Sequence, residues 1–321
     1  DFSFSAFEAD VINSLPEWDA EPGMAACNPY PCGSEGLDLL LASRDWSRSI
    51  ELLAGYYNRN GYGIYAMYKA FIWESRNGIG RLAGVENPDP IKLSDLIGYE
   101  EERSDVINNT LQFLKGYHAN NVLLYGDRGT GKSSTVKAIL NEYHAKGLRI
   151  VEVPKNQLID FPEIIKQLRD KNQKFIVFVD DLAFEDNEEN YTALKAVLEG
   201  SLESKPDNVL IYATSNRRHL IKEKFSDRLG FQSDNPEDEI RAADTMQEKL
   251  SLADRFGITV VYSSPDKYKY LEIVEGLTER KGIKIDREQL HREALKWELW
   301  YNGRSPRTAK QFVDWLEGNM A

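Results

Sequence analysis

Eight consecutive residues, Gly126-Asp127-Arg128-Gly129-Thr130-Gly131-Lys132-Ser133, fit the pattern G-x-x-x-x-G-K-[ST] in full. The glycines let the backbone curl around phosphate groups with its N–H groups pointing inward. Lys132 is predicted to neutralise charge at the β- and γ-phosphates, and the Ser133 hydroxyl is predicted to ligate Mg²⁺. The helix that follows would add the positive end of its dipole. The motif therefore predicts a site for a nucleoside triphosphate and its magnesium ion.

The residues around this loop predict an α/β fold. An apolar strand over 122–125 precedes the loop and a helix over 134–140 follows it, so the alternative of a simple tight turn carries little weight. The apolar run 175–179 has the continuous pattern of a strand buried on both faces. Alternating strands and helices indicate a three-layer αβα domain with a parallel sheet. The predicted strands are 121–125, 148–153, 175–179, 209–213 and 257–262, and the predicted helices are 133–146, 162–170 and 191–202.

Polar side chains follow two of these strands. Asp180 and Asp181 come directly after the run 175–179, at the strand end where open α/β sheets bind ligands. Asp180 is predicted to hold Mg²⁺ through water, and Asp181 is predicted to be the general base that orients an attacking water. Glu185 is a second candidate for the base, and a loop-capping role is the alternative for both aspartates. Asn216 follows the next strand and is predicted to contact the γ-phosphate or the water, with a helix N-cap as the alternative.

These elements, in this order, resemble AAA+ ATPases. The loop 126–133 looks like Walker A, residues 179–181 resemble Walker B, and Asn216 resembles sensor 1. The resemblance covers about residues 91–321. The acids after residue 179 and the segment 213–220 are similar, more narrowly, to a bacterial family of AAA+ ATP-binding proteins known only as a domain of unknown function.

Three further segments match the AAA+ pattern. Ile97-Gly98-Tyr99 resembles the segment that lines the adenine site. Arg255 resembles the arginine finger, with Arg228 as the second candidate, and Arg307 resembles sensor 2, with Arg304 as the reserve. The resemblance implies the nucleotide-binding residues Ile97, Gly98, Tyr99, Asp127, Arg128, Gly129, Thr130, Gly131, Lys132, Ser133, Ser134 and Arg307, the magnesium ligands Ser133 and Asp180, and the catalytic residues Asp181, Asn216, Arg255 and Arg307.

An arginine finger stabilises charge on the transferring phosphoryl group. In AAA+ proteins it reaches into the neighbouring subunit's site, so the resemblance implies a ring or helical homo-oligomer, expected to be a hexamer with ATP. Pairing of Arg255 with a nearby surface acid is the alternative. The Asp180-Asp181 pair departs from the Asp-Glu of many AAA+ enzymes, and the shorter carboxylate of Asp181 could slow hydrolysis.

Charge and sequence pattern divide the chain into three predicted units. The 321 residues carry 52 acidic and 40 basic side chains, a net charge of −12; residues 1–90 hold 13 of the acids and 6 of the bases. We predict an acidic N-terminal arm with a small helical region over 1–90, in which a helical pattern covers 37–74 and the aromatic residues pack a small core of their own. An αβα nucleotide-binding domain over 91–263 and an α-helical lid over 264–321 complete the chain. The first unit is the predicted partner-binding or assembly module.

Cysteine usage and hydropathy suggest a cytoplasmic protein. Cys27 and Cys32 are too few for a disulfide framework and, with four histidines, argue against a structural zinc site. Two thiols in a reducing compartment are favoured, and a local bridge is the alternative. No apolar run approaches the ~20 residues of a membrane span, and no signal-peptide pattern is visible. The first residue is Asp1, so the natural start is expected upstream.

Three functions are compatible with these features. The first is a Mg²⁺-dependent ATPase that remodels or assembles an unknown macromolecular partner. The second is a slow-hydrolysing, ATP-dependent switch or adaptor. The third is an initiator- or helicase-loader-like ATPase on nucleic acid, supported by the basic cluster over 217–224. The acidic stretch 186–190 argues against a threading unfoldase, and the lack of an N-K-x-D motif argues against a GTPase.

Overall fold

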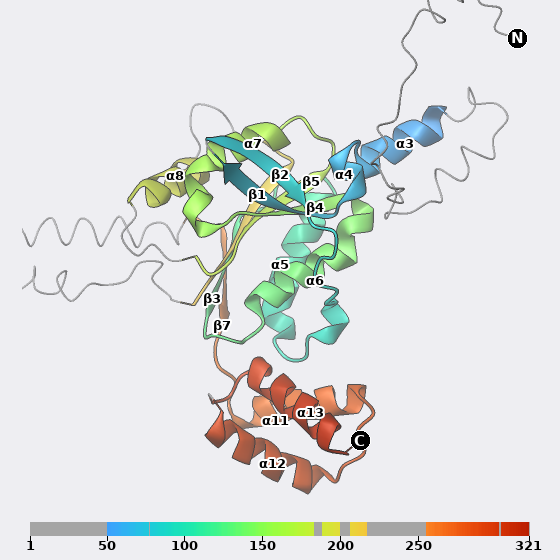
Figure 1. Cartoon of the computed structure of the whole chain (residues 1–321), viewed down its shortest axis with the longest axis vertical. Coiled ribbons are helices and arrows are strands. Elements are labelled where there is room, and N and C mark those ends of the chain that lie inside the picture. Colours follow the sequence, from blue (N-terminus) through green and yellow to red (C-terminus); the bar gives the residue numbers. More distant parts are fainter. Residues whose placement is uncertain are drawn as a thin grey trace, which may run out of the picture.

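One seven-stranded sheet organises the molecule (Figure 1). A computed structural model describes residues 50–76, 78–182, 188–199, 206–216, 255–301 and 303–320. The strand order is β2-β1-β4-β5-β6-β3-β7; β1 pairs with β2 in antiparallel fashion, and the other neighbouring pairs are parallel. The strands are β1 (Ala70–Arg76), β2 (Ile79–Gly84), β3 (Val122–Gly126), β4 (Leu148–Glu152), β5 (Lys174–Val179), β6 (Val209–Ser215) and β7 (Ile258–Tyr262).

Helices cover both faces of this sheet (Figure 1). α5 (Glu100–Leu114) and α6 (Lys132–Tyr143) bury apolar side chains on one face, and α7 (Phe161–Leu168) and α8 (Glu188–Glu199) do so on the other. The central strands β5 and β6 are apolar almost throughout because both of their faces are covered. The predicted three-layer αβα fold is confirmed, and β3 to β7 begin and end within two residues of their predicted positions.

Residues 70–84 correct the prediction for the N-terminal region. The helical pattern over 37–74 is wrong for residues 70–74, which begin β1, and β1 pairs in parallel with β4. Trp73 is fully buried in the core shared with α7, and its Nε1 donates to Asp160 Oδ2 at 2.9 Å. A Cβ on Gly80 would lie 1.9 Å from the Trp73 ring, so β2 needs glycine at this crossing. The predicted boundary at residue 90 therefore separates β1 and β2 from the rest of the sheet. Residues 70–74 form a strand because pairing with the distant strand β4 overrides their local helical pattern.

A buried arginine holds the two helices ahead of β1. Arg149 at the start of β4 is 1% exposed, and its guanidinium donates to the backbone oxygens of Asn60 at 3.1 Å and Tyr65 at 3.0 Å. Gln173, just before β5, donates to the carbonyl of Asn58 at 3.2 Å. A buried charge is tolerated only when hydrogen bonds replace its hydration. These contacts fix both helices at the amino ends of β4 and β5. The helices are α3 (Ile50–Asn60) and α4 (Ile64–Met67).

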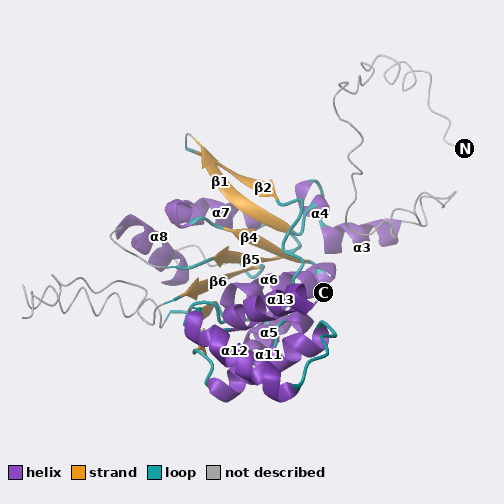
Figure 2. Ribbon diagram, turned by 60° about the horizontal axis from the view of Figure 1, so that its bottom comes forward, coloured by secondary structure: helices purple, strands orange, loops and turns teal. Residues whose placement is uncertain are grey.

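Three helices follow β7 and form the unit that we call the lid. The helical patterns at 266–281, 286–301 and 305–317 correspond to α11, α12 and α13, so these three predictions are confirmed. Carboxylates cap two of the helices: Asp266 accepts from the N–H of Lys269, and Asp286 accepts from that of Gln289. Figure 2 shows the lid helices together beside α5 and α6, with which they share an apolar core. The helices are α11 (Lys267–Arg280), α12 (Arg287–Trp300) and α13 (Pro306–Met320).

Short 3₁₀ turns complete the described chain at Leu93–Asp95, His144–Lys146 and Lys155–Asp160. Within the part of the chain that the structure describes, we find no helix long and apolar enough to cross a membrane. Cys27 and Cys32 lie outside the described residues.

Candidate functional site

The phosphate loop runs from β3 to α6, as the motif predicts. Its first glycine is required by a close approach: a Cβ on Gly126 would lie 2.1 Å from the carbonyl oxygen of Tyr262 in β7. Lys132, the first residue of α6, is 6% exposed and directs its ammonium to the carbonyl oxygens of Gly126 at 3.0 Å and Asp127 at 2.6 Å. Burial lowers the pKa of Lys132, and nearby carboxylates oppose that shift. A phosphate would give this partly desolvated ammonium a stronger, charged acceptor.

A magnesium-type donor pair lies beside the loop. Ser133 Oγ donates to Asp180 Oδ1 at 2.5 Å, which joins the start of α6 to the end of β5. Thr214 Oγ1 in β6 donates to the same carboxylate oxygen at 2.6 Å and accepts from the N–H of Asp181 at 2.8 Å. Hydroxyl and carboxylate oxygens are the ligands that Mg²⁺ prefers. The parallel strands β5 and β6 place these groups together because their carboxyl ends meet at one edge of the sheet.

Asp181 is held on both of its carboxylate oxygens. Asn216 Nδ2 donates to Oδ1 at 2.5 Å, and Lys155 Nζ pairs with Oδ2 at 2.7 Å. The residue adopts φ 52°, a left-handed conformation that non-glycine residues seldom take, directly after the extended backbone of β5. Burial alone would raise the pKa of Asp181, but the bonds from Lys155 and Asn216 and the charge of Arg128 more than offset this, so the pKa is lowered. The carboxylate is therefore ionised at neutral pH and engaged by neighbours.

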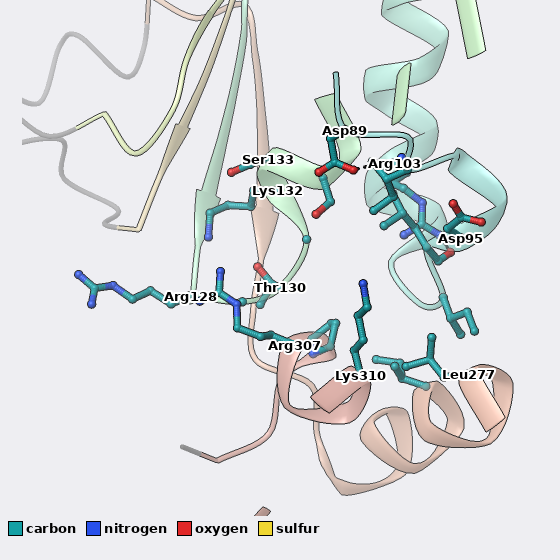
Figure 3. A pocket seen from close by; sticks show the side chains of 18 of the residues that line it. Asp89, Asp95, Arg103, Arg128, Thr130, Lys132, Ser133, Leu277, Arg307 and Lys310 are labelled. Carbon is teal, nitrogen blue, oxygen red and sulfur yellow. Dashed lines mark hydrogen bonds between the residues drawn. The ribbon is translucent and has the colours of Figure 1, made fainter. Parts of the chain in front are cut away.

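A cavity of about 1130 Å³ is bordered by the phosphate loop and by the lid (Figure 3). The loop residues 128–134 line it on one side, together with Asp180, Asp181 and Asn216. Figure 3 shows Arg307 and Lys310 projecting toward it from α13, while Arg128 extends away from the lid helices. The Arg307 N–H donates to the Gly129 carbonyl at 3.1 Å, so the start of α13 is attached directly to the phosphate loop. The positive side chains converge where a triphosphate would carry its negative charge.

Apolar side chains line part of the same cavity, although charged residues such as Asp95 and Arg280 line it as well. The apolar wall is formed by Ile97 and by the lid residues Ile273 and Leu277, together with Ile91 and Leu96. A buried guanidinium shapes this wall: Arg103 in α5 is 7% exposed and donates to the carbonyls of Leu96, at 2.9 Å, and Gly98. Apolar, cationic and acidic side chains thus line one cavity, which suits a nucleotide with its metal ion.

The structure does not bring all predicted residues to the cavity. Ile97, the residues 128–134, Asp180, Asp181, Asn216 and Arg307 line it, whereas Gly98, Tyr99 and Asp127 do not. Gly98 packs on Ile273, and a Cβ at this glycine would lie 3.1 Å from that side chain. Tyr99 is 2% exposed and stacks on Tyr262. Arg304, the reserve for sensor 2, pairs with Glu298 at 2.8 Å within the lid.

Arg255 lies near the amino ends of the parallel strands, at the opposite end of the sheet from the phosphate loop. It precedes the amino end of β7, whereas Tyr262 at the carboxyl end touches the phosphate loop. The four residue steps of β7 place these ends about 13 Å apart. Arg255 does not line the cavity of its own chain. Glu185, Arg228 and the basic cluster over 217–224 lie outside the described residues.

Three residues of the site escaped sequence reasoning. Thr214 had a usable signal, because it is a polar residue near the carboxyl end of β6, two residues before Asn216. Lys155 gave no signal, since its contact with Asp181 depends on β4 and β5 being neighbours. Lys310 enters the cavity because it follows Arg307 by three residues and shares its face of α13.

The complete phosphate loop after β3, the acids at the end of β5 and the helical lid beside the cavity together define a phosphate-loop protein with an αβα body, the arrangement that the resemblance to AAA+ ATPases implies. The chain belongs to the family described as "Protein of unknown function (DUF815)", which matches residues 66–320. The match begins ahead of β1, not at residue 91, in agreement with the position of β1 and β2 in the sheet.

Comparisons with other proteins add a structural likeness. No curated protein matches the chain. Among solved structures, the Thermotoga maritima RuvB Holliday junction branch migration motor is similar over 71% of this chain and 65% of its own, with 15% identity and a TM-score of 0.45. A point variant of the same motor gives a TM-score of 0.46, with 15% identity over 71% of this chain and 66% of its own. The chain thus spans slightly less than two thirds of these structures.

Proposed function

We propose that this protein binds Mg-ATP and hydrolyses it to ADP and phosphate to drive or gate the assembly of a macromolecular partner. The observation that carries the proposal is the joint position of Lys132, the Ser133–Asp180 pair and Arg307 around one cavity. Lys132 and Arg307 would supply positive charge to the triphosphate, and Ser133 and Asp180 would supply oxygen ligands to its magnesium ion. The apolar side chains of Ile97, Ile273 and Leu277 in the same cavity would pack on the base.

Magnesium fits the donor set beside the loop. Ser133 Oγ and Asp180 Oδ1 are hard oxygen donors that already lie within 2.5 Å of one another. They would hold the ion, and Thr214 would orient the Asp180 carboxylate through its hydroxyl. When bound, the ion would neutralise charge between the β- and γ-phosphates.

In this proposal Asp181 accepts the proton of the water that attacks the γ-phosphorus. Asn216 would keep the carboxylate aimed at that water through its amide bond to Oδ1. Lys132 and Arg307 would stabilise charge on the phosphoryl oxygens as the bond to the leaving ADP breaks.

The substitution Asp181→Asn tests the assignment of the base. We expect ATP affinity to stay within about threefold, while turnover falls by about 10²–10⁴-fold, the usual contribution of a general base. Asp105→Asn on the exposed side of α5 is the matched control and should leave turnover unchanged. Single-turnover hydrolysis and fluorescent-ATP titration give the two values. Full turnover by Asp181→Asn would exclude Asp181 as the base.

A slow switch is the second candidate, and one contact favours it. The Lys155 ammonium pairs with the carboxylate of Asp181, which must accept the proton. This pairing keeps the pKa of Asp181 low, and a lower pKa makes the carboxylate a weaker base. The hydrolysis rate of the wild-type protein separates the two candidates. A steady rate that rises steeply with protein concentration supports an ATPase, and a negligible rate with retained ATP binding supports the switch.

Oligomer formation is proposed from the place of Arg255. Because Arg255 lies at the far edge of the sheet from its own phosphate loop, a neighbouring subunit's site is the place where it could act as a finger. We propose a homo-oligomer, a hexamer with ATP, together with a further protein partner; nucleic acid is the less favoured partner given the net charge of −12. Affinity capture with Asp181→Asn in ATP should retain the partner, and sizing with ATP should show the oligomer. The low cysteine content supports a cytoplasmic location.

A further inference from the structure

Asp127, the second residue of the phosphate loop, directs its side chain to the chain segment that leads into the lid. Its Oδ2 accepts a hydrogen bond from the Ser264 N–H at 2.7 Å, and the residue does not line the cavity. Ser264 belongs to the connector over 263–266 that joins β7 to α11 of the lid. A carboxylate directed at a phosphate would repel it, and the bond to Ser264 removes that conflict. Hydrogen bonds from Ser264 also lower the pKa of Asp127, so the acceptor carries a full negative charge.

A second residue, Tyr99 of the segment 97–99, holds the same connector. Tyr99 Oη donates to the Ser263 carbonyl at 2.5 Å, and its ring stacks on Tyr262 with 5.3 Å between centroids. The backbone of Tyr99 adopts φ 62°, a conformation that non-glycine residues seldom take. Two successive connector residues are therefore held: Ser263 by Tyr99 and Ser264 by Asp127 of the phosphate loop.

The backbone of Asp127 is bonded to groups that respond to phosphate. Its carbonyl accepts from Lys132 Nζ at 2.6 Å and from Thr130 Oγ1 at 2.9 Å, while its N–H donates to the Tyr262 carbonyl at 2.9 Å. A phosphate competes with the Asp127 carbonyl for the Lys132 ammonium. Phosphate binding therefore changes the bonds of the same residue whose side chain holds the lid connector.

We propose that Asp127 is a positioning residue that couples the phosphate loop to the lid: its carboxylate sets the lid orientation through Ser264 and does not bind the nucleotide. The proposal rests on the proposed function insofar as ATP is the ligand that the lid senses. A hydrogen bond to a charged group can shift a two-state equilibrium by about tenfold or more, which is enough to decide the lid position. Tyr99 makes the matching contact, through its hydrogen bond to Ser263.

Distance measurements between the body and the lid test this coupling. Spin labels at Lys166→Cys in α7 and Glu288→Cys in α12, with Cys27 and Cys32 changed to Ser, report the lid position by pulsed electron resonance, with and without a non-hydrolysable ATP analogue and Mg²⁺. The variants are Asp127→Ala, which removes the acceptor, and Asp127→Asn, which keeps a carbonyl oxygen for the Ser264 N–H. Asp105→Ala, an exposed acid of α5, is the charge control.

We expect Asp127→Ala to broaden the distance distribution without nucleotide and to reduce the change that the analogue causes by at least about half, consistent with loss of a charge-assisted bond. Analogue affinity should stay within about threefold of the wild-type value. Asp127→Asn should restore most of the response, which a general loss of folding would not do. Asp105→Ala should match the wild type.

Two results would overturn the proposal. One is a lid distribution in Asp127→Ala that equals the wild type in both conditions. The other is a loss of analogue affinity of about tenfold or more in both Asp127 variants with the lid distribution unchanged, which would make Asp127 a nucleotide-binding residue. If the wild-type protein does not bind the analogue, the proposed function fails, and the distribution without nucleotide still decides whether Asp127 positions the lid.

Discussion

The carboxyl edge of β3, β5 and β6 and the N-terminal flank of the same sheet are built in different ways. At the carboxyl edge, the critical groups come from short motifs that each follow a strand, and the sheet only brings the strand ends together. The flank, from α3 to β2, depends on contacts with residues far along the chain, such as Arg149 and Asp160. Chemistry is thus locally encoded at one edge, whereas the limits of the folded unit depend on long-range packing.

Deletions should show this difference most strongly. Removing residues 1–90 removes Phe71 and Trp73 from the core and leaves β4 without its neighbour. Each buried aromatic side chain contributes about 3–5 kcal/mol, and the sum approaches the whole stability of a domain, about 5–15 kcal/mol. We expect this fragment not to melt cooperatively by circular dichroism, whereas removal of residues 1–49, which keeps both strands, should preserve a cooperative transition. A cooperative, ATP-binding 91–321 fragment would restore the boundary at residue 90.

A single substitution in β1 should have a smaller effect of the same kind. Trp73→Ala is expected to lower the free energy of unfolding by about 3–5 kcal/mol, since the ring is fully buried and its Nε1 bond to Asp160 is lost. Ile72→Ala changes the adjacent residue, which is 39% exposed, and should cost about 1 kcal/mol or less. Urea denaturation measures both. Equal small losses would mean that β1 adds little to the core.

At the carboxyl edge, substitution should affect binding without affecting stability. Lys132→Ala is expected to weaken ATP binding by about 100-fold or more, because a buried charge partner of the phosphates is removed. Burial disfavours the charged form of Lys132, as its lowered pKa shows, so the free energy of unfolding should change little. Lys137→Ala on the same helix, where the lysine pairs with Asp89 at 3.7 Å, is the control for charge. Unchanged affinity in Lys132→Ala would remove the basis of the nucleotide site.

The smallest expected effect concerns the Lys155–Asp181 contact. The base acts only when ionised, so hydrolysis should fall as the pH drops through the pKa of Asp181, which lies below its usual value. Lys155→Gln removes the positive charge that pairs with Asp181 and therefore raises the pKa of Asp181. The acidic limb of the plot of hydrolysis rate against pH should then move to higher pH. A stronger base should also raise the rate at pH 7 by roughly twofold to fivefold.

The control for this experiment is Lys166→Gln, an exposed lysine of α7 that should leave the profile in place. The same shift of pKa predicts a stability change of matching sign. The contribution of the Lys155–Asp181 pair is present above the unfolded pKa of the carboxyl group and is lost as the pH falls through its folded value. A rate profile for Lys155→Gln that overlays the wild type would show that the ion pair does not tune the base.

Sequence reasoning predicted much of the fold because its signals were periodic and local. The buried strands β5 and β6 read as unbroken apolar runs, and the lid helices began at Asp266 and Asp286, whose side chains cap them. The error in β1 has an equally local origin: its aromatic residues continue a helical pattern, and only pairing with β4 makes them a strand.

The candidate site was predictable to the extent that a motif carries its own geometry. The phosphate loop belongs to this class, because a strand, a glycine-rich turn and a helix start must lie together in any fold that contains them. Asp180 was predictable for a different reason, since acids that follow a buried parallel strand lie at the sheet edge where ligands bind. Two other contacts could not be predicted in this way: the pairing of Lys155 with Asp181 and the hydrogen bond from Arg103 to the Leu96 carbonyl. Each contact joins segments that only the strand order or the packing of a helix brings together.

Asp127 shows where this division falls within a single motif. The pattern alone marks it as a residue of the phosphate loop, and the backbone bonds of the loop follow from that pattern. The direction of its carboxylate does not, because the Ser264 N–H reaches it only after β7 has paired with β3 and the chain has turned toward the lid. Local residue spacing determines which backbone groups can face a phosphate, whereas the partner of a side chain depends on which distant segment the folded chain places within 3 Å of it.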